Sequence, residues 1–151
     1  MVFVQITFSF LAILVVMVGW RVIYNNARRL ACRSEAHSHV MRMISSIEDI
    51  EFSAIAHWSS REKISSTEVQ FLLGRIMALR SYLSVSDAYF GEGWWGASLA
   101  ELRSVLSLDI EYKHTLPGDD LQKRMLSAHH GCGQMKKKII EKFIQSYSVS
   151  F

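Results

Sequence analysis

Three glycines enclose two adjacent tryptophans in the stretch GEGWWG, residues 91–96. The spacing matches G-x-G-x-x-G, in which a strand leads into a tight turn and a dinucleotide pyrophosphate rests on the next helix N-terminus. Here the residues before Gly91 carry the apolar spacing of a helix, and no second strand completes a βαβ unit. The bulk of Trp94 and Trp95 would also obstruct a phosphate. We therefore expect no nucleotide and no other cofactor.

Trp94 and Trp95 matter more than the glycines around them. In one interpretation the loop joins two helices and both rings fold back onto the core. In the other interpretation the rings form an exposed tip, since tryptophan is enriched at the contact points of protein interfaces. A bilayer contact by this tip would require the preceding long helix to bend or tilt. We assign Trp94 and Trp95 as candidates for partner or membrane contact, with the core interpretation left open.

The densest group of potential metal ligands is His129-His130-Gly131-Cys132. Zinc prefers imidazole nitrogen and thiolate sulfur, but a structural site needs four ligands, usually from two separated pairs. The sequence offers no convincing second pair. We expect a polar helix end that runs into a glycine loop, because Gly131 and Gly133 flank the cysteine. A metal site at His129, His130 and Cys132 is the alternative.

Nucleophilic catalysis has little support in the sequence. A serine or cysteine nucleophile needs a positioned base and a set of oxyanion donors, and the chain contains no G-x-S-x-G motif. Glu48, Asp49 and Glu51 are neighbours that splay around a helix, so they do not form a carboxylate pair. We assign no catalytic residue. The competing function is a membrane-tethered, metal-dependent enzyme that uses His129 and its neighbours.

Residues 2–20 contain no charged side chain. As a helix this stretch rises about 28 Å at roughly 1.5 Å per residue, close to the ~30 Å hydrocarbon core of a bilayer. Trp20 and Tyr24 suit the interfacial zone, and Arg21 can extend its charge toward the headgroups. We expect residues 1–24 to form a transmembrane anchor.

A signal peptide and a buried helix fit this apolar segment less well than an anchor does. A cleaved signal peptide has a basic beginning, an apolar run of about 7–15 residues and a small-x-small cleavage site. Here the beginning carries no Lys or Arg, the run is longer, and residues 21–33 offer no such site. A buried helix of a soluble protein rarely runs this far without a charge.

Arginines follow the apolar segment at once. Up to residue 42 the chain carries five basic residues and one acidic residue, whereas from residue 43 on it carries twelve and thirteen. Because an arginine excess beside a span marks the cytoplasmic side, we expect the N-terminus outside and residues 25–151 in the cytosol. The basicity is local and does not indicate a nucleic-acid partner. The candidates for contact with anionic lipid or a partner are Arg28, Arg29 and Arg33.

The rest of the chain predicts further helices and no convincing strand. Ser65-x-x-Glu68 and Ser98-x-x-Glu101 are typical capping boxes, so each marks a helix start. Asp119 is the expected cap of the last helix. Lysines 136–138 beside an apolar stripe resemble a membrane-surface helix, but we expect the closing helix of the bundle with a solvated basic face.

Apolar side chains at intervals of three and four predict the buried face of each helix. The first helix after the anchor is expected over residues 25–59, and it can continue unbroken from the anchor because no Gly or Pro lies between Arg21 and Trp58. The second helix is expected to end just before Gly91. The interruption at residues 131–133 would divide the last helix into two. The expected stripe of the first helix is Leu30, His37, Val40, Met41, Ile44, Ile47, Ala54, Ile55 and Trp58.

The sequence therefore predicts an all-α protein with one N-terminal transmembrane helix and a small cytosolic bundle of four or five helices. Cys32 and Cys132 lack a disulfide framework, which agrees with a reducing compartment. We expect a single-pass protein of an inner or plasma membrane. Its predicted function is that of a binding, adaptor or regulatory subunit that assembles with a protein partner, or with copies of itself, at the bilayer.

Overall fold

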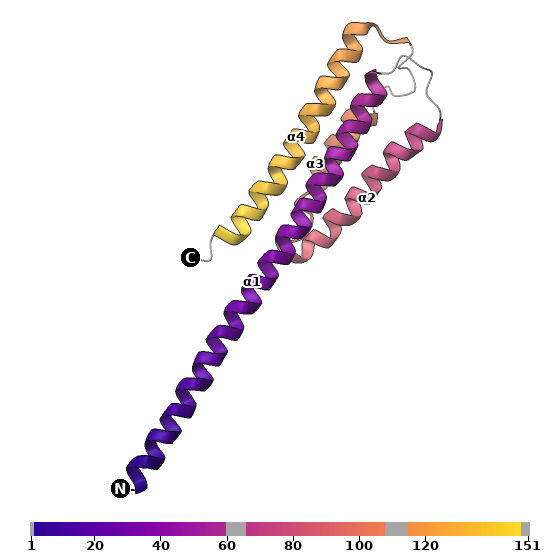
Figure 1. Cartoon of the computed structure of the whole chain (residues 1–151). Coiled ribbons are helices and arrows are strands. Elements are labelled where there is room, and N and C mark those ends of the chain that lie inside the picture. The colour runs from indigo at the N-terminus through magenta and orange to yellow at the C-terminus, as the bar shows by residue number, and fades with distance from the viewer. Residues whose placement is uncertain (1, 60–65, 108–114, 149–151) are drawn as a thin grey trace. The chain divides into compact units, whose positions relative to one another are not determined.

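The computed structural model of the chain describes residues 2–59, 66–107 and 115–148, with side chains over 9–59, 67–107 and 115–147. These residues form helices and short turns, with no strand among them. The helices are α1 (Val2–Ser59), α2 (Ser66–Phe90), α3 (Gly96–Ser107) and α4 (Gly118–Ser148) (Figure 1). The all-α prediction is confirmed.

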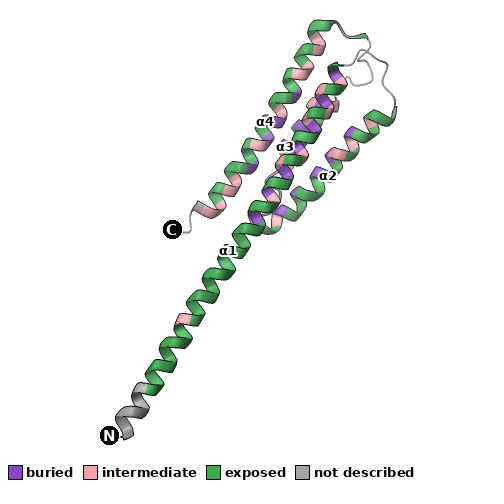
Figure 2. Ribbon diagram, viewed as in Figure 1, coloured by how far each residue is buried: buried purple, intermediate pink, exposed green. Residues whose placement is uncertain are grey.

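The chain divides into two compact units, Met1–Glu35 and Ala36–Phe151. The first unit is a single helical segment of α1, and its described apolar side chains are exposed almost without interruption (Figure 2). The exposed fraction runs from 44% for Leu14 to 73% for Trp20. By length and composition, α1 contains a window apolar enough to cross a membrane, and none of that window is buried.

The second unit is a helical bundle in which each helix contributes one buried stripe. The part of α1 from Ala36 onward runs alongside α2 and α4, and α3 packs most extensively on α4 (Figure 1). Members of a stripe alternate three and four residues apart, the spacing of helices that pack at shallow angles. The stripe of α1 is Ala36, Val40, Met43, Ile47, Ile50, Ala54 and Trp58, and that of α2 is Leu72, Ile76, Leu79, Leu83, Ser86 and Phe90.

The buried face of α1 agrees with the predicted one at positions 40, 47, 54 and 58 and differs from it elsewhere. Met41, expected inside, is 51% exposed, whereas Met43 and Ile50 are fully buried. The sequence offers two adjacent apolar stripes, since positions 40, 43 and 54 are each followed by another apolar residue. Packing against neighbouring helices selects between them, which periodicity within one helix cannot do.

Two predicted helix starts are displaced. Ser98 is not a cap, because α3 already begins at Gly96 and the Gly96 amide donates to the Gly93 carbonyl at 3.2 Å. Likewise the Pro117 carbonyl accepts the first helical bond of α4, from the Leu121 amide at 3.1 Å. Asp119 therefore lies inside the first turn of α4, where a negative charge stabilises the helix N-terminus. The predicted cap Ser65 lies outside the described residues.

The predicted interruption at Gly131-Cys132-Gly133 is wrong, since α4 continues through it. The physical reason is packing against α3. A Cβ atom on Gly131 would lie 3.5 Å from Leu102 Cδ1, an ordinary contact distance, so α3 packs directly on this part of α4. Cys132 falls between Ala128 and Met135 on the buried stripe of α4. The described bundle accordingly has four helices rather than five.

Candidate functional site

The predicted metal ligands do not come together in the structure. Cys132 is fully buried in the core, whereas the side chain of His129 is 69% exposed and His130 is also at the surface. Neighbouring positions on one helix point about 100° apart, so continuity of α4 separates His129 from His130. Within the residues that the structure describes, no three His, Cys, Asp or Glu side chains are grouped to hold a metal ion.

The Cys132 thiol is held in its neutral form. Burial, and after it the negative charge of Glu51, raises the pKa of Cys132 to about 12. Since the thiolate is both the nucleophile and the metal ligand, this cysteine is poorly suited to either role. It fills core space as a small apolar side chain.

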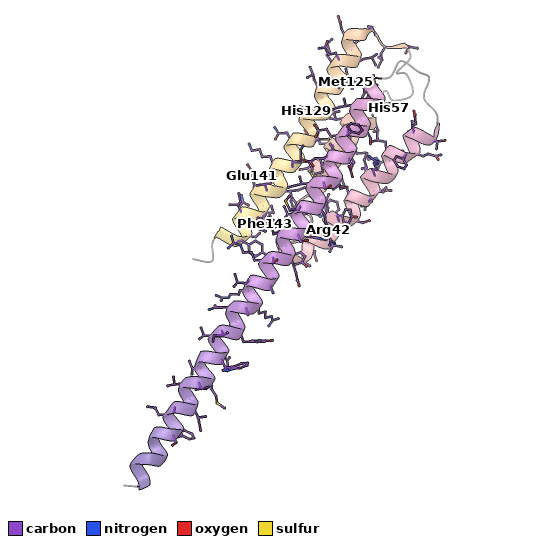
Figure 3. The ribbon with its side chains drawn as sticks, in the orientation of Figure 1. Arg42, His57, Met125, His129, Glu141 and Phe143 are labelled. Carbon is purple, nitrogen blue, oxygen red and sulfur yellow. The ribbon has the colours of Figure 1, made fainter. Side chains whose placement is uncertain are left out.

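Glu51 forms a polar cluster with two residues of α4. Its side chain is 13% exposed and accepts from Lys136 Nζ at 2.9 Å, and His129 Nδ1 lies 2.5 Å from the other oxygen. His129 lies on the stretch of α4 that runs alongside α1 (Figure 3). The cluster ties these two helices together through charge-assisted hydrogen bonds.

The charges of this cluster stabilise one another. Burial by itself would raise the pKa of Glu51, but hydrogen bonds from Lys136 and His129, together with their charges, leave that pKa below its ordinary value. The hydrogen bond to Glu51 raises the pKa of Lys136 in turn. Both groups are therefore ionised at neutral pH, as expected for a structural ion pair.

The three consecutive lysines of α4 point to different partners. Lys136 reaches Glu51 on α1, and Lys138 Nζ donates to Ser98 Oγ on α3 at 2.6 Å. Lys137 is exposed, with its amine 3.8 Å from Glu141. Two of the three lysines thus bind α4 to its neighbours, which favours a closing bundle helix over a membrane-surface helix.

The GEGWWG stretch is a tight turn between α2 and α3. Gly91 and Gly93 adopt φ values of 90° and 71°, a region that glycine enters without strain. The Gly91 amide bonds to the Asp87 carbonyl at 3.0 Å, so α2 ends at a C-terminal glycine as predicted. A helix precedes this turn, which removes the strand that a dinucleotide turn requires.

Trp94 and Trp95 pack against the domain and do not form an exposed tip. Both are partly buried beside the core. Trp95 Nε1 donates to Asp87 Oδ1 at 2.8 Å, and the ring of Trp94 meets Phe90 edge to face at a centroid distance of 6.0 Å. The geometry therefore favours the core interpretation for these rings.

An aromatic cluster that the sequence analysis did not identify surrounds Phe143. Its centroid lies 6.4 Å from Phe90, 5.9 Å from His37 and 5.0 Å from Tyr147, so it joins α1, α2 and α4. Phe143 lies on α4 beside α1 in Figure 3. The available signal was the pair Phe143 and Tyr147, which are four apart and share a helix face.

The predicted contact arginines Arg28, Arg29 and Arg33 all lie in the first unit and are exposed. Cys32 in the same segment is also exposed. These residues are therefore free to meet headgroups or a partner surface, and none is used to build the bundle.

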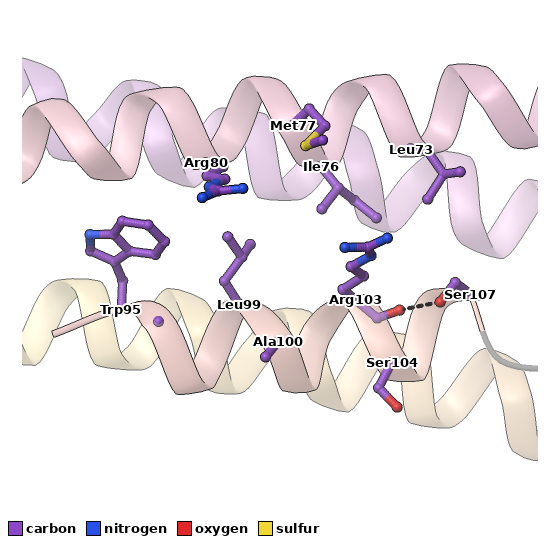
Figure 4. Close-up of a pocket in the computed structure, with 11 residues that line it drawn as sticks. Leu73, Ile76, Met77, Arg80, Trp95, Leu99, Ala100, Arg103, Ser104 and Ser107 are labelled. Carbon is purple, nitrogen blue, oxygen red and sulfur yellow. Dashed lines mark hydrogen bonds between the residues drawn. The ribbon is translucent and has the colours of Figure 1, made fainter. Parts of the chain in front are cut away.

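A cleft of about 590 Å³ opens between α2 and α3 (Figure 4). Its surface is mainly apolar, with Leu73 and Ile76 from α2 facing Leu99 from α3. Arg80 and Arg103 extend into the same space from opposite helices. Sequence reasoning missed this cleft because neither arginine belongs to a motif, and only the pairing of α2 with α3 brings them together.

No protein-family model, curated protein or solved structure matches the chain. The functional conclusion therefore depends on the residues and their geometry alone.

Proposed function

We propose that this protein is a single-pass membrane protein whose helical domain binds a protein partner at the bilayer, as an adaptor or regulatory subunit. The observation that carries the proposal is the uncovered apolar surface of α1. From Phe10 to Tyr24 the large apolar side chains are exposed, and the only charge among these residues is Arg21. Such a surface is unstable in water and requires a lipid or protein cover.

Lipid is better suited than a protein partner to surround this apolar surface of α1. Its apolar side chains point in every direction around the helix, as in a membrane span, whereas a helix packed on a protein has one apolar stripe. Leu, Ile, Val and Phe each favour insertion by about 0.3–0.6 kcal/mol at the centre of a span. The tryptophan and tyrosine near the end of the segment add interfacial anchors.

The arginines after the span support a cytosolic domain. Arg28, Arg29 and Arg33 are exposed within reach of the interface and favour the inner side of an inner or plasma membrane. Each adds on the order of 1 kcal/mol of attraction to anionic lipid. The domain beyond them would then be presented to cytosolic partners.

Binding is favoured over catalysis because the polar clusters of the described domain serve packing. Glu51, His129 and Lys136 satisfy one another, and Cys132 is buried. The three residues of the metal-dependent alternative do not come together, because Cys132 is buried whereas His129 and His130 lie at the surface.

Alkaline carbonate extraction tests the anchor. The wild-type chain is expected to stay in the membrane pellet, and Leu14→Arg with Val15→Arg to move it into the soluble fraction, because each arginine costs roughly 2.5–3.5 kcal/mol within a span. The matched control places two arginines at exposed apolar positions of the domain, Phe71→Arg with Leu126→Arg, and should remain membrane-bound.

Two results would refute the anchor. One is release of the wild-type chain by carbonate without detergent. The other is a mature protein that begins downstream of Trp20. The adaptor role is tested separately by residue-specific cross-linking from Arg28 and Arg33 in native membranes, where a defined protein band that depends on the position of the cross-linker is expected.

A further inference from the structure

The α2–α3 cleft has the dimensions of a small-molecule site. Ligand sites in proteins enclose roughly 300–1,000 Å³, are mostly apolar, and occur between the helices of bundles. At about 590 Å³ the cleft lies within that range. Leu73, Ile76 and Leu99 supply an apolar floor, while Met77 and Trp95 add polarisable surface (Figure 4). The apolar body of a ligand can rest on this floor.

Two arginines, both exposed to solvent, face this apolar floor. Arg80 and Arg103 line the cleft, and none of the lining residues that the structure describes is acidic. Among the described side chains neither guanidinium has an ion-pair or hydrogen-bond partner; only the backbone carbonyl of Arg103 is bonded, to the Ser107 hydroxyl at 2.7 Å. Two positive charges with no acidic partner among the described residues, placed around an apolar floor, are complementary to an anion with an apolar body.

We propose that the α2–α3 cleft binds a small carboxylic acid with an apolar chain, whose carboxylate accepts hydrogen bonds from Arg80 and Arg103. The planar guanidinium fork matches the two oxygens of a carboxylate. A compact acid fits better than a protein segment, because a cavity of about 590 Å³ holds a small molecule, whereas a stable protein interface uses about 20–30 residues on each side. The site is independent of the membrane anchor.

Octanoate is the probe for this site. The full-length protein is placed in lipid nanodiscs with its four tryptophans isotope-labelled at the indole nitrogen. Trp95 borders the cleft, and Trp95→Phe assigns its resonance. The Trp95 signal is expected to shift saturably with octanoate, while Trp20, Trp58 and Trp94 report on effects outside the cleft.

The arginines set the affinity in this proposal. Arg80→Gln with Arg103→Gln should raise the midpoint of the Trp95 titration by roughly tenfold, since two charge-assisted hydrogen bonds are lost at a partly solvated site. Arg42→Gln is the matched control, because Arg42 is an exposed arginine that lines a different groove, between α1 and α2. It should leave the midpoint unchanged. Octanol, which has the same chain without the charge, should bind at least several-fold more weakly.

Other outcomes overturn the proposal. A shift of Trp20 alone means that octanoate only enters the bilayer. Equal binding of octanol, or an unchanged midpoint in the double variant, means that the arginines do not select an acid. A Trp95 shift with an acidic amphipathic peptide but none with octanoate would assign the cleft to a protein partner instead.

Discussion

At the scale of single residues, the most informative group is Glu51. It is the polar side chain on α1 around which His129 and Lys136 of α4 are organised. Its charge-assisted hydrogen bonds link α1 to α4 across their interface. Its contribution should be visible as a pH dependence of stability.

The pKa of Glu51 is lower in the folded chain than its ordinary value of 4.5, so the unfolded chain takes up a proton first as pH falls. The stabilisation is complete above that ordinary value and is lost as pH falls through the folded-state pKa. The pKa of Lys136 is raised, so its share is complete below 10.5 and is lost as pH rises through the folded-state pKa. Between pH 4.5 and pH 10.5 both charged groups contribute fully to the stability of the folded chain.

Glu51→Gln is therefore expected to lower the free energy of unfolding by about 1–2 kcal/mol at neutral pH, because a charge-assisted pair is lost. The difference from wild type should shrink under acidic conditions, where wild-type Glu51 is itself protonated. Urea unfolding followed by circular dichroism at several pH values measures this. Glu141→Gln, at an exposed and loose pair with Lys137, is the control and should change stability little.

At the scale of the elements, α4 differs most from its sequence pattern. Two glycines around a cysteine are typical of a loop, yet the helix passes through them because α3 packs against this face. The local cost of glycine in a helix is about 1 kcal/mol each. Tertiary packing outweighs that cost. Substitutions of these glycines by alanine, which restore helix propensity, can therefore test whether α4 is continuous.

Gly133→Ala is expected to stabilise the domain by about 0.5–1 kcal/mol, since α4 is helical there and no atom lies within 4 Å of the new methyl group. Gly131→Ala should gain at least as much, because its methyl group meets Leu102 at an ordinary contact distance. Gly93→Ala is the contrast and should destabilise by roughly 1 kcal/mol, because φ is positive there. Destabilisation by all three substitutions would mean that residues 131–133 form a loop. Thermal unfolding resolves these differences.

The tryptophan rings of the GEGWWG turn, which leads from α2 into α3, pack against residues of α2. Trp94→Ala with Trp95→Ala should lower stability by about 2–4 kcal/mol, somewhat less than for fully buried tryptophans, because the Asp87 hydrogen bond and the Phe90 contact are lost. Phe52→Ala, at a side chain that is 76% exposed, is the matched control. A double variant that keeps its stability but loses partner capture would restore the exposed-tip interpretation.

At the scale of the whole molecule, the chain combines an exposed apolar helix with a domain that has its own core. The chemical reactivity of the two cysteines can test the proposed membrane topology. Cys32 is exposed just after the proposed span, whereas Cys132 is buried with a pKa of about 12. Only Cys32 should react with a thiol reagent while the domain is folded.

A membrane-impermeant maleimide is therefore expected to label the protein in inside-out vesicles and to leave it unlabelled in intact cells. Cys32→Ser should abolish the labelling, and Cys132→Ser should leave it unchanged. Labelling in intact cells would place the arginine-rich segment outside and contradict the proposed orientation. Labelling that requires Cys132 would instead show that the core of the domain is open.

Much of the fold was predictable because its signals are local. Apolar residues three and four positions apart predicted the helices, and Gly91 predicted the end of α2. The same apolar spacing marks positions of α2 and α3 that are buried, such as Leu72, Leu83 and Leu102. The buried face of α1 was anticipated only in part, because the helix has a second apolar stripe. The continuity of α4 was not anticipated, because its glycines resemble a loop.

The site was less predictable than the fold. The sequence drew attention to residues that share a motif, such as His129 with Cys132 and Trp94 with Trp95, and the structure uses these residues mainly for packing. No sequence pattern marked Arg80 and Arg103, because they are far apart in the chain and neither belongs to a motif.

The sequence by itself determined the helical class, the long uncharged run at the start and the arginines beside it, because periodicity, composition and charge are properties of single segments. Only the tertiary structure decided which face of each helix is buried, that α4 continues through its glycines, and that two arginines share one apolar cleft. Those features depend on how the surfaces of separate helices fit together, and that fit cannot be read from any one of them.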